Sequence, residues 1–224
     1  MAFLFWWLFF PCLASSSNIL PLLPPHTQEL RLSYDGHWIS QGEKMSRNDT
    51  VLPPQISTAG LPCPHRFIIF CIDIDVVLES NATVILHWYQ PDMTTNCSNS
   101  HLSPKHEIAA VSSSKSAAYI GPQPPAGASH RYVFLAFQQP DHYVFPDCFD
   151  HIFPKTVEAR AGFDIQLFSR VAGLPPPVAG NYIVVGSDEL TTTTTATQSV
   201  TTTSMRDVRC TGVNGGHIGQ QVIM

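Results

Sequence analysis

Three clusters of polar residues adjoin apolar stretches of the sequence, and together their side chains could bind a small anion. The clusters are residues 73–75 (Asp-Ile-Asp), His87 with Trp88, and residues 130–132 (His-Arg-Tyr), which come after the turn-rich segment 121–125. Imidazole and backbone N–H groups donate hydrogen bonds to an anion, and carboxylates orient the imidazoles. If the clusters meet at strand ends beside this glycine–proline segment, the sequence predicts a small anion-binding pocket.

Two carboxylates and two histidines could also perform acid–base catalysis or hold a metal, so a hydrolase is the alternative from another class. The sequence contains no nucleophile elbow, no His-Glu-x-x-His motif and no phosphate-binding loop. It contains no Cys-x-x-Cys unit, and the spacing of His101 and His106 matches no recognised metal site. We therefore predict a protein without catalytic residues, bound metal or cofactor.

The apolar stretches have the composition of β-strands, which must position these clusters. Residues 66–72 form a nearly continuous apolar run, as in a strand that is buried on both faces. Residues 83–89 and 130–137 are rich in β-branched and aromatic side chains. Residues 163–174 have apolar side chains at helical spacing and end at a glycine and three prolines, which predicts a helix. Residues 181–185 predict a closing strand.

The segment 119–135 closely resembles a signature of the phosphatidylethanolamine-binding protein family, because its Gly-Pro, Pro-Pro and His-Arg-Tyr elements stand in the family's order. Residues 73–77 resemble the family's Asp-Pro-Asp-x-Pro motif, with isoleucine and valine in place of both prolines. Residues 86–88 resemble the histidine motif that follows, and residues 163–185 are similar to the closing segment. The resemblance covers roughly residues 61–186.

This resemblance implies a mostly β fold of packed antiparallel sheets with a few short helices, one of them near the C-terminal end of the domain. It implies a pocket for a small anion such as phosphate or a phospholipid headgroup, in a non-enzymatic binding protein. Because some relatives inhibit serine carboxypeptidases, inhibition of such a protease through the protein surface is the alternative. The residues that the resemblance places at the pocket are Asp73, Asp75, His87, Gly121, Pro122, His130 and Tyr132.

The amino-terminal residues indicate secretion. Residues 1–13 are almost entirely apolar and precede small residues, and the stretch is shorter than the roughly 20 residues that span a bilayer. Residues 1–16 are therefore predicted to be a signal peptide, with an uncleaved signal anchor as the alternative. Sequons for N-glycosylation at Asn48, Asn81 and Asn96 fit the same route. We expect an extracellular glycoprotein with no membrane span in its mature chain.

Cysteine usage agrees with an oxidising compartment. Cys12 belongs to the predicted signal peptide, and the four cysteines of the predicted domain allow three pairings, among which the sequence does not choose. We expect at least one disulfide, with Cys97 and Cys148 as participants because both lie in polar loop context. Cys71 lies within an apolar strand and has the setting of a buried thiol.

Composition divides the rest of the chain into three parts. Residues 17–60 are a loop-rich N-terminal segment, residues 61–190 form the domain core, and residues 191–224 are a Thr/Ser-rich tail that we expect to be disordered. The net charge is -5 and only 13% of the residues are charged. Such a chain offers no basic surface for nucleic acid, so we expect no nucleic-acid partner.

Overall fold

The structure is a computed structural model that describes most of the predicted domain. The described residues are 22–23, 27–57, 59, 61–62, 65–78, 80–94 and 115–187, together with the backbone of residues 109–110. The predictions for the signal peptide at 1–16, for Asn96 and Cys97, and for the tail at 191–224 lie outside these residues.

Short strands come first and long strands follow. The short strands are β1 (Gln28–Glu29), β2 (Leu32–Tyr34), β3 (His37–Trp38), β4 (Glu43–Ser46) and β5 (Gln55–Ile56). The later strands are β6 (Arg66–Leu78), β7 (Asn81–Thr94), β8 (Ala109–Ala110), β9 (Ser129–Gln138) and β10 (Ala179–Gly186). The helical elements are the 3₁₀ helices η1 (Asn48–Thr50) and η2 (Asp147–Ile152), and the α-helices α1 (Val157–Arg160) and α2 (Ile165–Val171).

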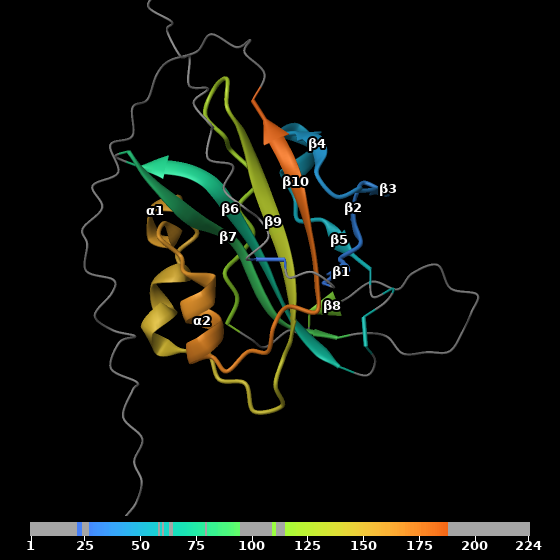
Figure 1. Ribbon diagram of the computed structural model, residues 1–224, viewed down its shortest axis with the longest axis vertical. Coiled ribbons are helices and arrows are strands. Elements are labelled where there is room, and N and C mark those ends of the chain that lie inside the picture. Colours follow the sequence, from blue (N-terminus) through green and yellow to red (C-terminus); the bar gives the residue numbers. More distant parts are fainter. Residues whose placement is uncertain are drawn as a thin grey trace, which may run out of the picture.

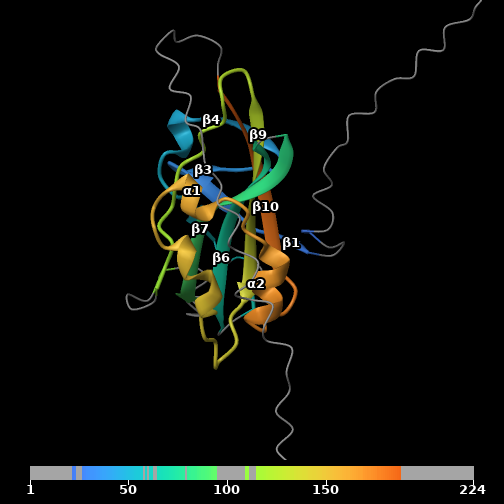
Figure 2. The same cartoon turned by 90° about the vertical axis from the view of Figure 1, so that its left-hand side faces the viewer.

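The strands form one seven-stranded sheet and one small three-stranded sheet. Hydrogen bonding gives the order β1-β10-β9-β6-β7-β8 in the large sheet, with β4 also paired to β10, and β3-β2-β5 in the small sheet. The helices cover one face of the large sheet, and the small sheet lies on the opposite side (Figure 1 and Figure 2). The prediction of packed β-sheets with a few short helices is confirmed.

The last described strand joins the two ends of the domain. β10 pairs antiparallel with β9 and parallel with β1 and β4. The buried amide of Asn181 in β10 donates from Nδ2 to the carbonyl oxygen of Leu30 at 2.8 Å, across 151 positions of sequence. The parallel pairings are an addition to the antiparallel sheets that were expected, and they come from the N-terminal segment.

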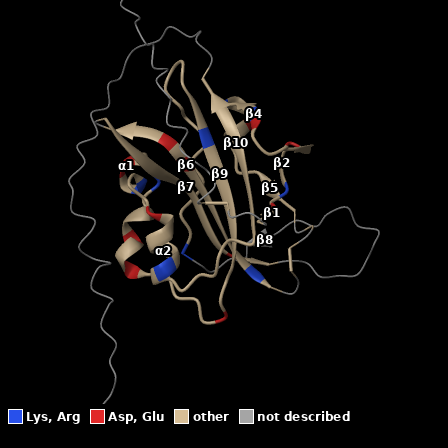
Figure 3. Ribbon diagram, in the orientation of Figure 1, with Lys and Arg blue, Asp and Glu red and all other residues tan. Residues whose placement is uncertain are grey.

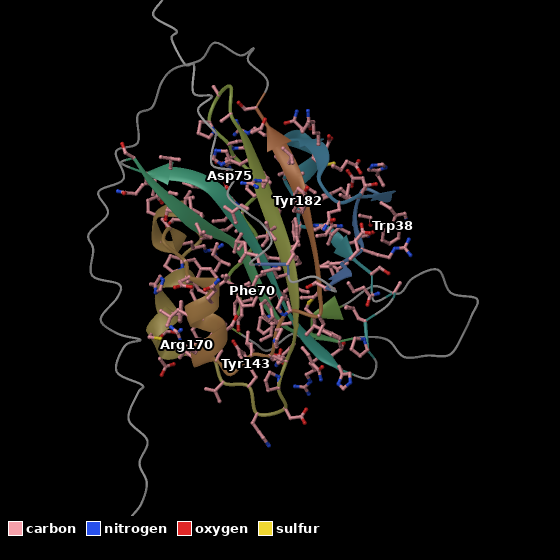
Figure 4. The ribbon with its side chains drawn as sticks, in the orientation of Figure 1. Trp38, Phe70, Asp75, Tyr143, Arg170 and Tyr182 are labelled. Carbon is pink, nitrogen blue, oxygen red and sulfur yellow. The ribbon has the colours of Figure 1, made fainter. Side chains whose placement is uncertain are left out.

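A hydrophobic core fills each face of the large sheet, and β6 contributes to both. Phe67 faces the core that contains Leu32 of the small sheet. Phe70, labelled in Figure 4, faces the helices and contacts Phe168 of α2 with the two ring centroids 5.2 Å apart. Charged residues are sparse along the strands of the large sheet, as Figure 3 shows. Burial on both faces is therefore confirmed for residues 67–72 of the predicted run, whereas Arg66 at its start is exposed.

The predicted C-terminal helix is present as α2, and its ends have clear local causes. The side chain of Asp164 accepts hydrogen bonds from the backbone N–H groups of Gln166 and Leu167, which caps the first turn. Gly173 adopts a φ of 66°, a left-handed conformation that favours glycine and ends the helix.

Strand β6 does not end at residue 72 as the apolar run predicted. It continues to Leu78, with irregularities in its pairing to β7 between Cys71 and Ile72 and between Asp73 and Val76. Asp73 is paired with β7 and β9 on either side, and pairing with β7 resumes at Val76, so the strand continues despite the loss of apolar character.

The described cysteines differ in state. Cys71 is free and fully buried, whereas Cys148 is disulfide-bonded. Asn48 and Asn81, the two described sequon asparagines, are exposed. No helix among the described residues is long and apolar enough to cross a membrane.

Candidate functional site

Asp73 and His130 meet because β6 and β9 are neighbours in the large sheet. In the antiparallel register Asp73 lies opposite Tyr132, two residues beyond His130. The Asp73 side chain is almost fully buried, and its Oδ2 lies 2.8 Å from Nδ1 of His130. A buried carboxylate accepts this charge-assisted hydrogen bond when the imidazole is protonated. The hydrogen bond to Asp73 accordingly raises the pKa of His130.

Tyr132 and His87 extend this pair into a cluster of four side chains. Tyr132 is buried, and burial, the charge of Asp73 and a hydrogen bond to Asp73 raise the pKa of its hydroxyl. The rings of His87 and Tyr132 meet edge to face, with their centroids 5.0 Å apart. We call Asp73, His87, His130 and Tyr132 the acid–histidine cluster. Contacts therefore connect His130 to Asp73, Asp73 to Tyr132, and Tyr132 to His87.

A backbone carbonyl group, that of Ile120, holds His87 in one tautomer. Its Nδ1 lies 2.8 Å from the carbonyl oxygen of Ile120, which only accepts hydrogen bonds, so Nδ1 carries the proton. Neutral His87 then presents Nε2 as a hydrogen-bond acceptor, and protonated His87 presents it as a donor. Burial lowers the pKa of His87. The two histidines of the cluster are thus shifted in opposite directions.

The glycine–proline segment lies against the cluster through its backbone. The N–H of Ile120 donates to the carbonyl oxygen of His87 at 2.8 Å. A backbone hydrogen bond from Gln123 to the hydroxyl lowers the pKa of Tyr132, against the larger effect of burial. Gly121 packs so closely on the backbone of Thr50 and Val51 that a Cβ there would lie 3.1–3.2 Å from backbone atoms. Any other residue would push this segment and the backbone of Thr50 and Val51 apart by a few tenths of an ångström.

Pro122 is buried and lies between Gly121 and Gln123, whose backbone is hydrogen-bonded to Tyr132. Its ring restricts the backbone at the point where the chain leaves His87 and approaches Tyr132. The side chain of Pro122 has no polar atom, so it makes no hydrogen bond to Asp73 or Asp75. Its contribution is to the shape of the segment.

Asp75, the second acid of the motif, pairs with Arg131 rather than with His130. Its Oδ2 accepts from the backbone N–H and Nε of Arg131 at 2.8 and 2.7 Å, and its Oδ1 pairs with Nη2 of the same arginine. The carboxylate of Asp75, labelled in Figure 4, contributes to the raised pKa of His130 only through its charge. The backbone N–H of Asp75 in turn donates to Oδ1 of Asp73 at 3.0 Å, which links the two acids.

Sequence reasoning missed Arg160, which adjoins the cluster from α1. The side chain of Arg160 is fully buried, and its Nη1 lies 3.4 Å from the carbonyl oxygen of His87. The positive charge of Arg160 contributes to the lowered pKa of His87. The only signal in the sequence is a lone arginine between two alanines, which is as compatible with an exposed helix position as with a buried one.

A cavity of about 500 Å³ lies at the other end of the large sheet, away from the acid–histidine cluster. It is lined by residues that include Arg66 at the start of β6 and Gln138 at the end of β9, whereas Asp73 and His130 lie toward the opposite ends of these strands. Within the part of the chain that the structure describes, no three His, Cys, Asp or Glu side chains are grouped closely enough to hold a metal ion.

Comparisons with known proteins agree with this fold. Two fungal proteins named Phomoidride biosynthesis cluster protein N are similar to this chain. The protein from Talaromyces stipitatus is 36% identical over 187 residues, which cover 77% of this chain and 92% of that protein. The other, from Fungal sp., is 41% identical over 122 residues, which cover 54% of this chain and 53% of that protein.

Among solved structures, the fold is similar to that of the carboxypeptidase Y inhibitor in its complex with the cognate proteinase. The TM-score is 0.51 at 19% sequence identity, over 72% of this chain and 84% of the other. The family model described as Phosphatidylethanolamine-binding protein matches residues 30–181, which include the three strands that carry the cluster, β6, β7 and β9, and the start of β10. The chain belongs to the phosphatidylethanolamine-binding protein family.

Proposed function

We propose that this protein is a secreted, non-enzymatic binding protein that captures a small phosphate-like anion at the acid–histidine cluster. The observation that carries the proposal is the hydrogen bond between Asp73 and His130, which favours a protonated imidazole within a mostly buried cluster. A protonated imidazole supplies both a positive charge and a second N–H donor to an anion. The segment 120–123 adds backbone hydrogen-bonding groups beside the cluster, at Ile120 and Gln123.

The charges around the cluster support an anion rather than a cation as ligand. Asp75 is matched by Arg131, and Asp73 is matched by His130 when that histidine is protonated. Arg160 then remains as a positive charge with no acidic partner among the described residues. The local balance is therefore positive once His130 holds its proton, and more positive when His87 also gains one.

Titration calorimetry of the purified protein at about pH 5 tests this proposal. Sulfate is the first probe because its charge is constant across the histidine range, and inorganic phosphate and glycerophosphoethanolamine are the second and third. We expect saturable binding of sulfate, weakened about tenfold or more by His130→Asn, since a charge-assisted hydrogen bond is lost. His142→Asn is the matched control, because His142 is exposed on a loop.

The three probes separate a free anion from a lipid headgroup. Tighter binding of glycerophosphoethanolamine than of phosphate would identify the headgroup as the ligand, and equal or weaker binding would favour the free anion. Absence of saturable binding of all three probes at this pH would refute anion capture.

Inhibition of a serine carboxypeptidase is the second candidate function, and the fold similarity to carboxypeptidase Y inhibitor is the observation in its favour. It requires only an exposed surface, so it predicts inhibition that survives His130→Asn. Incubation of the protein with carboxypeptidase Y, followed by hydrolysis of a peptide substrate, tests it. Loss of inhibition in the His130→Asn variant would instead tie the activity to the cluster.

We propose that the protein catalyses no reaction, although two similar proteins are named for a biosynthesis cluster. The one hydroxyl of the acid–histidine cluster, on Tyr132, is buried and has a raised pKa, and the free thiol of Cys71 is fully buried, so neither is activated as a nucleophile. Esterase and peptidase assays test this proposal. Turnover that disappears in a folded His130→Ala variant would contradict it.

A further inference from the structure

Arg160 is the most unusual charged residue of the described chain. It is the last residue of α1, its side chain has no exposure to solvent, and none of the ion pairs among the described residues includes it. Burial lowers the pKa of its guanidinium to about 10. A buried charge without a partner costs several kcal/mol, so such a residue persists only where it serves a purpose.

The guanidinium of Arg160 binds four backbone carbonyl groups instead of a carboxylate. Its Nε lies 2.8 Å from the oxygen of Ile152, the last residue of η2, and 3.1 Å from that of Pro154, two residues further on. Its Nη1 lies 2.6 Å from the oxygen of Ala118 and 3.4 Å from that of His87. Arg160 therefore joins the helical layer to β7 and to the segment before Gly121.

Two of these carbonyls belong to the short ladder that orients the imidazole of His87. Ala117 exchanges backbone hydrogen bonds with Tyr89, and Ile120 exchanges two hydrogen bonds with His87, one of them to the ring. Nη1 of Arg160 donates to a carbonyl group in each of the two chain segments that form this ladder, that of His87 in one and that of Ala118 in the other. Movement of the arginine would therefore move the imidazole and the glycine–proline segment together.

The third nitrogen, Nη2, is buried and has no hydrogen-bond partner. Four carbonyl dipoles lower the cost of the buried guanidinium, but dipoles do not cancel a net charge. The field of Arg160 reaches the cluster, since its charge helps to lower the pKa of His87. The same field favours any negative charge that arrives next to His87.

We propose that Arg160 is the positioning residue of the anion site: it ties the His87 strand to the Ala118–Gly121 segment, and its unpaired charge attracts the anion from behind them. This inference rests on the function proposed above. It assigns a role in binding to a residue that does not itself touch the ligand. The alternative is a structural role alone, in which Arg160 only fastens α1 to β7.

Two variants separate these roles. Arg160→Met removes the charge and all four hydrogen bonds, and Arg160→Lys keeps the charge but supplies a single nitrogen for the four carbonyls. Arg66→Met is the matched control, because Arg66 is an arginine at the far end of β6 with a side chain 65% exposed. For each protein, NMR titration gives the pKa of His87 without ligand, calorimetry gives the Kd for sulfate near pH 7, and urea unfolding gives the stability.

We expect Arg160→Met to raise the pKa of His87 and to weaken sulfate binding about tenfold, as expected for loss of a nearby charge. Arg160→Lys should leave the pKa of His87 close to that of the unaltered protein and weaken binding by less, because only the positioning is impaired. Arg66→Met should change neither quantity. A purely structural role predicts lower stability in both Arg160 variants with unchanged sulfate affinity.

Unchanged sulfate affinity in folded Arg160→Lys and Arg160→Met would overturn the inference. If Arg160→Met fails to fold, Arg160→Lys decides alone, since sulfate affinity equal to that of the unaltered protein contradicts positioning. Failure of the proposed function looks different: the unaltered protein itself would bind no sulfate, while the pKa of His87 would still respond to Arg160→Met.

Discussion

At the residue scale, His87 and His130 share one cluster but hold their protons differently because their partners differ. His130 faces the carboxylate of Asp73, which raises its pKa, whereas His87 is buried against a backbone carbonyl and a tyrosine ring, and burial lowers its pKa. A site with both kinds of histidine changes its charge in two separate steps as the pH falls.

This difference predicts the pH dependence of anion binding. As the pH falls, sulfate affinity should increase first above about pH 6.5, where His130 gains its proton, and again below it, where His87 does. Calorimetry from about pH 9 to about pH 4.5 at constant ionic strength measures both steps. In His130→Asn the upper step should disappear and the lower one should remain. A single step near pH 6.5 would contradict the opposite shifts.

Asp73→Asn should lower stability in a pH-dependent way. The raised pKa of His130 stabilises the fold below its unfolded value of about 6.5, and this contribution is lost as the pH rises through the folded value. Loss of the charged partner should therefore cost about 2 kcal/mol near pH 6 and less near pH 9. Urea unfolding at both pH values measures the difference. Asp141→Asn, at an exposed loop position, is the control; an equal cost at both pH values would argue against the ion pair.

The sequence could predict part of the cluster and not the rest. Asp73, His87 and His130 adjoin apolar stretches and stand in the order of the family's motifs, so their convergence could be expected. The partner of Asp75 could not, because the sequence does not show which acid meets Arg131. Arg160 could not be found either, since its role depends on carbonyl groups from distant segments that no residue type encodes.

At the scale of elements, the glycine–proline segment connects η1 to the cluster by close backbone contact. Gly121→Ala should displace the segment, because the new Cβ would meet the backbone of Thr50 and Val51 at 3.1–3.2 Å. We expect a loss of about 1–3 kcal/mol of stability, together with weaker sulfate binding. Gly186→Ala is the control, since its Cβ would meet the hydroxyl of Ser129, which can rotate. Equal effects of both substitutions would contradict this account.

The long strands and α2 could be predicted because burial on one or two faces leaves a pattern in the sequence. The strands β1 to β5 could not, because elements of two to four residues are too short to show a period and are formed by their partners in the sheets. The continuation of β6 through Asp73 was missed because Asp73 and Asp75 interrupt the apolar run. Its neighbours β7 and β9, rather than apolar composition, keep it in the sheet.

At the scale of the whole molecule, Cys71 reports on the integrity of the large sheet and of the core between the two sheets. It is fully buried in the middle of β6, and burial raises the pKa of its thiol well above its usual value. Iodoacetamide should label it about a thousandfold or more slowly in the native protein than in urea, since reaction requires global unfolding. Mass spectrometry of the peptide that contains Cys71 follows the reaction. Rapid labelling without denaturant would show that the sheet opens locally.

The position of β10 sets the order in which the protein can be completed during synthesis. A ribosome that has translated only as far as α2 has released β1 and β4 without the strand that each must join. The residues of β1 and β4 then lack their pairing partner until β10, encoded about 150 codons downstream, has been translated. Chaperones that mask strand edges are therefore expected to matter more to this chain during translation than after it.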